Sequence, residues 1–92
     1  MIPQQAFLCI LNEFSRLDNI ELVDAGYHAP FFGNFTVSYM VSGSKRSIVC
    51  DKHEVALCAD LTGEHGCQTV VLNVSEVTAP QLITALRAQR AI

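Results

Sequence analysis

A run of alternating residues from Phe35 to Ser42 constrains the fold of this chain more than any other feature. Large apolar residues occupy every second position, and mostly small polar residues lie between them until Gly43 breaks the pattern. Successive side chains of a β-strand point to opposite faces, so this period of two predicts a half-buried strand. Other strand-like segments follow, and we predict an antiparallel meander whose buried face includes Phe35, Val37, Tyr39 and Val41.

Helical patterns flank this region at both ends of the chain. Residues 3–18 begin with Pro3, which suits the first turn of a helix, and continue with apolar residues at spacings of three and four. Near the C-terminus, Thr78 and Gln81 have the spacing of a capping box around Pro80. The apolar residues of this second predicted helix are Leu82, Ile83 and Leu86.

Shorter segments complete the expected sheet at residues 20–24, 47–50 and 68–74. Residues 52–62 fit two patterns. Asp51 and Glu54 have the spacing of a helix cap, whereas the apolar residues from Val55 to Leu61 alternate as they do in a strand. We interpret this segment as a strand that follows a hairpin turn at 51–54.

Together these patterns predict one α+β domain over residues 1–92, with an antiparallel meander of four or five strands and both helices packed on one face. The inner side of the sheet is expected to carry Ile20, Leu22, Phe35, Val37, Tyr39, Val41, Val55, Leu57, Val70 and Leu72. The helix residues expected to face it are Phe7, Ile10, Leu11, Phe14, Leu82 and Leu86.

Composition argues against several classes of partner. The formal charge is −3 and the six Lys and Arg residues are scattered, whereas nucleic-acid binding draws on clustered cations. No apolar stretch approaches the roughly 20 residues that span a bilayer, and we see no export signal. We therefore expect a cytoplasmic protein that binds neither nucleic acid nor membrane. Half of the residues are apolar and only 16% are charged, which favours self-association.

The cysteines and histidines are the first candidates for chemistry. A zinc site could draw on Cys50, His53, Cys58, His65 and Cys67, yet two of these cysteines fall inside apolar strands, where a thiol usually acts as a small core residue. Cys58 and Cys67 are the pair we would test first for a disulfide. Cys50 has His53 and Lys52 nearby but no third orienting group, so we assign no catalytic residue, metal or cofactor.

Two surfaces are candidates for binding. The outer side of the predicted sheet carries Met40, Ala56, Cys58 and Val71, which is less polar than a fully wetted face. Residues 26–34 form a loop whose aromatic rings either fold onto the core or make a binding surface. The leading hypothesis is a non-catalytic protein that dimerises, or binds another protein, through one of these surfaces. An alternative is a small-ligand or enzymatic pocket between loop and sheet, using Tyr27, His28, Phe31, Phe32 and Tyr39.

Overall fold

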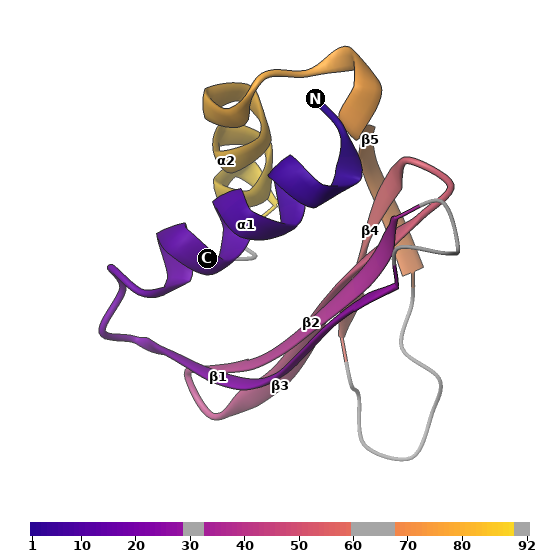
Figure 1. Cartoon of the computed structure of the whole chain (residues 1–92). Helices are drawn as coiled ribbons and strands as arrows, with labels where there is room; N and C mark the ends of the chain where they lie inside the picture. Colours follow the sequence, from indigo (N-terminus) through magenta and orange to yellow (C-terminus); the bar gives the residue numbers. More distant parts are fainter. Residues whose placement is uncertain (29–32, 60–67, 90–92) are drawn as a thin grey trace.

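A computed structural model describes residues 1–28, 33–59 and 68–89 and confirms the predicted α+β architecture. The elements follow in the order α1 (Pro3–Phe14), β1 (Ile20–His28), β2 (Asn34–Val41), β3 (Ser44–Asp51), β4 (Glu54–Ala59), β5 (Gln68–Asn73), the 3-10 helix η1 (Val74–Glu76) and α2 (Ala79–Ala88). Each strand pairs antiparallel with its sequence neighbour, in the order β1-β2-β3-β4-β5. Both helices lie on the same side of the twisted sheet (Figure 1).

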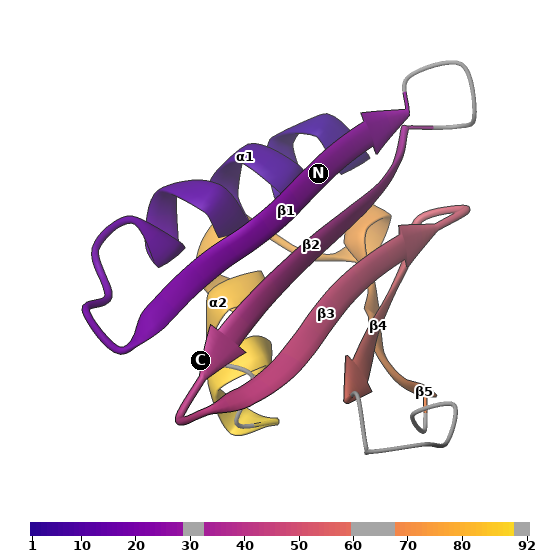
Figure 2. The same ribbon diagram turned by 90° about the horizontal axis from the view of Figure 1, so that it is seen from below.

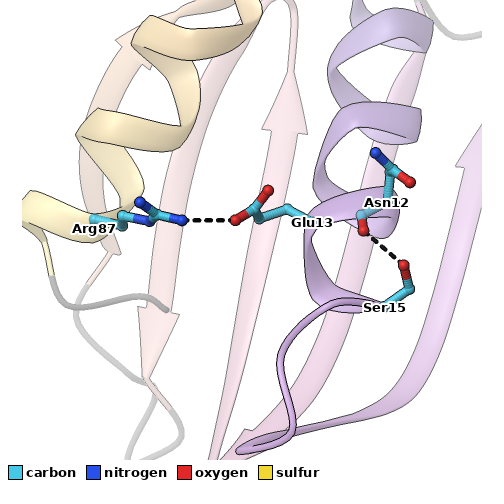
Figure 3. Close-up of polar contacts among 4 residues, drawn as sticks. All are labelled: Asn12, Glu13, Ser15 and Arg87. Carbon is cyan, nitrogen blue, oxygen red and sulfur yellow. Dashed lines mark hydrogen bonds and ion pairs between the residues drawn. The ribbon is translucent and has the colours of Figure 1, made fainter.

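Helix α1 is shorter than the predicted 3–18. It begins as expected at Pro3, and the Gln5 side chain accepts a hydrogen bond from the Ile2 N–H at 3.1 Å. It ends at Phe14 because Ser15 donates its hydroxyl proton to the Asn12 carbonyl at 2.6 Å (Figure 3), and the following N–H groups bond three residues back instead of four. Such bonds tighten the last turn and stop the α-helix.

The alternation of β2 is confirmed. Phe35, Val37 and Tyr39 are buried on the helix side, and Thr36 between them is exposed on the other side. Tyr39 contacts α1 edge to face, with its ring centroid 4.7 Å from that of Phe14. The core between helices and sheet consists of Ala6, Ile10, Phe14, Phe35, Val37, Tyr39, Val41, Ile48, Cys50, Val55, Val74, Leu82 and Leu86.

Strand β1 differs from the prediction in length and in burial. It continues past Asp24 to His28, so Gly26 lies within the strand and does not end it. A register shift between Leu22 and Asp24 marks a bulge at Val23, which moves the inward alternation from even to odd positions. Leu22 lies opposite Tyr39 on the helix side, as predicted, but it remains 49% exposed because β1 is an edge strand.

The strand interpretation of residues 52–62 is confirmed for Glu54–Ala59, and the rest lies outside the described residues. Two-residue turns join β2 to β3 and β3 to β4. Positive φ angles at Ser42 (52°), Gly43 (77°), Lys52 (50°) and His53 (71°) give both turns the twist that tight hairpins favour.

Strand β5 stops one residue before the predicted end. The Asn73 side chain accepts hydrogen bonds from the backbone and hydroxyl of Ser75, at 2.9 and 2.6 Å, and so begins η1. A register shift between Val55 and Ala56 also interrupts the pairing of β4 with β5, so that Leu72 lies opposite Val55 and Val70 opposite Ala56. The side chain of Val70, which the alternation assigns to the inner face, lies outside the described part of the structure. The strict period of two therefore fails at both edges of the sheet, where bulges occur.

Helix α2 begins at the predicted capping box, where the Thr78 N–H donates to Gln81 Oε1 at 2.9 Å. One ion pair joins the two helices: Arg87 Nη2 lies 2.7 Å from Glu13 Oε1 (Figure 3). Because the Arg87 side chain is 61% exposed, we assign this pair no more than about 1 kcal/mol of stability. No helix in the described part of the chain is long and apolar enough to cross a membrane.

Candidate functional site

The side of the sheet opposite the helices, which we call the outer face, is covered by no described helix (Figure 2). Strand register places side chains there from four adjacent strands. They are Glu21, Asp24 and His28 of β1, Asn34, Thr36, Ser38 and Met40 of β2, Lys45, Ser47, Val49 and Asp51 of β3, and Glu54, Ala56 and Cys58 of β4. A sheet face of this size is normally either covered or fully polar, and among the described residues this one is neither.

The centre of the outer face is uncharged. Six short side chains from β2, β3 and β4 form this central patch: Thr36, Ser38, Ser47, Val49, Ala56 and Cys58. The hydroxyl groups of Ser38 and Ser47 hydrogen-bond to each other at 3.2 Å, which removes part of their demand for water. Ala56 is only 8% exposed. A surface of short side chains whose polar groups are partly satisfied can be covered by another surface at little desolvation cost.

Charged groups lie at the edges of the outer face. Asp51 and Glu54 face each other at one end of the strands, and Lys45 lies at the other end, beside Met40. The acidic end is held in place by Asn34, whose Nδ2 donates to Asp51 Oδ1 at 2.9 Å and whose Oδ1 accepts from the Lys52 N–H at 3.0 Å. The outer face thus has an acidic end and a basic position at its opposite end.

The aromatic candidates separate in the structure. Tyr27 belongs to β1, is half-buried on the helix side, and stacks on Phe7 with ring centroids 5.6 Å apart. His28 is exposed on the outer face at the end of the same strand. Met40 is half-buried on the outer face. Phe31 and Phe32 lie outside the described residues. Tyr27 and His28 therefore point to opposite sides of the sheet and do not share a pocket.

The metal candidates are also divided. Cys50 is buried on the helix side, whereas Cys58 is half-buried on the outer face, so the sheet separates the two thiols. His53 lies in the β3–β4 turn, where its Nδ1 is buried without a hydrogen-bond partner among the described residues. His65 and Cys67 lie outside the described ranges. Within those ranges, no three His, Cys, Asp or Glu side chains are grouped closely enough to hold a metal ion.

The described cysteines, Cys9, Cys50 and Cys58, carry free thiols. Burial raises the pKa of the Cys50 thiol to about 11, against a smaller lowering by the backbone N–H of His53. Burial and the nearby Glu13 carboxylate also raise the pKa of Cys9. A nucleophilic cysteine needs the thiolate form near neutral pH, and these environments favour the neutral thiol.

The exposure of apolar side chains at the edge of the sheet formed by β1 is a feature that the sequence did not predict. Leu22 and Val23 are 49% and 52% exposed there, and a shallow groove beside them lies between β1 and the end of α1. The groove is lined by Leu11, Phe14, Ser15, Leu17, Ile20 and Leu22. The predicted meander already made residues 20–24 its first strand and placed Leu22 on the inner side, but the alternation gave no sign that Leu22 would stay half-exposed there.

Comparison with known proteins finds no matching family model, and no curated protein or solved structure with significant similarity to this chain.

Proposed function

We propose that this protein is a non-catalytic binding domain that self-associates through the outer face of its sheet. The observation that supports this proposal is a sheet face that neither helix covers, uncharged at its centre and charged at its edges. Depletion of charge at the centre, with polar groups around it, is the usual composition of a protein interface. The partner is a second copy of the same chain, for the reasons that follow.

Part of the charge on the outer face is complementary to itself. If a second copy is turned by half a turn about an axis across the strands, each strand runs over its own counterpart in the opposite direction. Lys45 then lies over Asp51 of the second copy, and Glu21 lies over His28 of the second copy. Stacked sheets lie about 10 Å apart, with their strands within about 30° of alignment. Side chains at the edges of the two faces can span that distance.

The area of the outer face sets the expected affinity. Four strands about 4.8 Å apart, each contributing seven or so residues of about 3.3 Å, cover roughly 400 Å². Two copies would therefore bury roughly 800 Å², which is below the range of stable specific interfaces and fits only a weak, transient one. We expect a rapidly reversible dimer that forms at high protein concentration.

Charge also argues against nucleic acid as the partner. The outer face carries four carboxylates, Glu21, Asp24, Asp51 and Glu54, against the single cation Lys45. Phosphate groups would be repelled by this balance. As part of the same proposal we place the protein in the cytoplasm, where a reducing environment keeps thiols such as those of Cys9, Cys50 and Cys58 free.

Sedimentation equilibrium over a wide concentration range tests the proposal. The variant Thr36→Arg places a long charged side chain in the central patch and should abolish the dimer. Thr84→Arg is the matched control, because Thr84 is an exposed threonine on helix α2 and the same substitution there leaves the outer face unchanged. A wild-type protein that stays monomeric at the highest concentrations, or equal weakening by both variants, would contradict the proposal.

A further inference from the structure

Strand β1 presents a free backbone edge. It pairs only with β2, and no described residue pairs with its other side (Figure 2). An edge strand offers unpaired N–H and C=O groups, to which another extended chain can add as a further strand.

The bulge at Val23 divides this edge into two parts that differ in accessibility. Beyond the bulge, the N–H of Ala25 donates to the Asp24 carboxylate at 2.9 Å, so the protein itself satisfies that donor. Before the bulge, over residues 20–23, no side chain in the described part of the chain bonds to the backbone of β1. The first part of β1 is therefore the accessible part of the edge.

The two sides of this accessible part have different chemistry. On the helix side lies the apolar groove lined by Leu11, Phe14, Leu17, Ile20 and Leu22. On the outer side, a second depression includes the carboxylates of Asp18 and Glu21. The described ion pair of the protein, between Arg87 and Glu13, lies elsewhere, and no described cation forms a salt bridge with Asp18 or Glu21. An added strand would thus meet apolar surface on one side and, on the other, carboxylates that have no salt-bridge partner among the described residues.

We propose that the edge of β1 at residues 20–23 binds an extended segment of another protein, in which apolar and basic side chains alternate. Neighbouring side chains of a strand point to opposite sides. The apolar side chains would therefore enter the groove beside Leu22, and the basic side chains would lie against Glu21 and Asp18. Backbone hydrogen bonds to β1 supply affinity, and the alternation supplies specificity.

Two other occupants fit this edge less well. In an antiparallel pair of two β1 strands, the outer sides would bring Glu21 and Asp24 of one copy beside the same carboxylates of the other, and like charges in such positions repel. A helix could fill the apolar groove but could not bond to the backbone of the edge strand. An extended basic and apolar segment satisfies the backbone, the groove and the charge together.

Fluorescence anisotropy with a short labelled peptide of alternating lysine and valine tests the inference. We expect saturable binding that weakens with added salt. An N-methylated form of the peptide keeps every side chain but loses backbone hydrogen-bond donors. Its affinity should therefore be lower by a factor of about ten or more. A peptide with glutamate in place of lysine should show no binding. Absence of binding by the lysine peptide to folded protein would overturn the inference, as would equal affinity for the N-methylated or the glutamate peptide.

A pair of matched variants locates the site. Leu22→Lys places a charge in the groove and should weaken binding of the lysine peptide by about tenfold or more. Leu8→Lys makes the same substitution at a leucine of α1 that is 56% exposed, and should leave the affinity unchanged. Equal weakening by both would overturn the inference. Thr36→Arg should bind the peptide normally, so failure of the proposed dimer and failure of this site are distinguishable.

Discussion

Neighbouring residues of β2 provide the sharpest test of which side of the sheet is the core. Val37 is 0% exposed and lies opposite Ile48, whereas Thr36 is exposed on the outer face. Valine and threonine have nearly the same shape and differ by one hydroxyl group. Val37→Thr therefore buries a hydroxyl among apolar groups, while Thr36→Val removes one from water, and neither substitution changes the packing volume appreciably.

The two substitutions should differ strongly in their effect on stability. Burial of a hydroxyl without a good partner costs about 1–3 kcal/mol, so Val37→Thr should lower the midpoint of thermal unfolding by roughly 4–20 °C in a domain of this size. Thr36→Val should change the free energy of unfolding by less than about 0.5 kcal/mol. The assays are thermal unfolding for the midpoint and urea unfolding for the free energy, both followed by far-ultraviolet circular dichroism in dilute solution so that association does not add to stability.

The same pair links stability to self-association. Thr36→Val enlarges the apolar part of the outer face, so it should strengthen the proposed dimer, while Val37→Thr should leave the affinity of the folded protein unchanged. If Thr36→Val destabilised the protein as much as Val37→Thr, the assignment of the two faces would be refuted, and with it the proposed binding surface.

Three further predictions concern charge, pH and backbone geometry. Lys45→Glu should weaken the dimer, and adding Asp51→Lys should restore it, as sedimentation equilibrium would show; a double variant no better than the single one would contradict the proposed stacking. Burial raises the pKa of Cys50 from 9.0 to about 11, so the folded state favours the neutral thiol. The stability that the neutral Cys50 contributes is therefore fully present below pH 9 and is lost as the pH rises towards 11. Urea melts should show this loss, and Cys50→Ala should reduce it. Gly33→Ala should destabilise the protein more than Gly43→Ala in the same assay: both glycines have positive φ, but a Cβ at Gly33 would lie 3.1 Å from Pro3 and Tyr27 atoms, whereas one at Gly43 meets nothing within 4 Å.

The central strands could be predicted from sequence because one physical cause dominates there. Strand β2 has one side covered by the helices and one side that they leave uncovered. Burial therefore follows the alternation of its side chains, as the fully buried Val37 and Tyr39 show. The hairpins between β2, β3 and β4 have the shortest loops, which leaves no freedom to slip the register. The same reasoning explains why Glu54–Ala59 reads correctly as a strand despite its helix-like cap.

Prediction failed where local hydrogen bonds or bulges override the periodic pattern. Leu17 continues the apolar spacing of α1, yet a hydroxyl bond from Ser15 ends that helix three residues earlier. Valine is common on either face of a strand. The identity of Val23 therefore does not reveal the bulge that shifts the register of the later part of β1. For the candidate site, the apolar character of Met40, Ala56 and Cys58 was readable, but the complementary positions of charge at the two ends of the strands depend on register.

The order of the strands has a consequence for how the chain folds. Because every strand pairs with its neighbour in sequence, the sheet can assemble through successive local hairpins, each of which closes only a short loop. The contact between α1 and α2, which Arg87 and Glu13 bridge, instead joins opposite ends of the chain. Docking of the terminal helix is therefore the step with the greatest loop-closure entropy. We expect truncation of core side chains such as Leu82 and Leu86 to accelerate unfolding while leaving the refolding rate nearly unchanged.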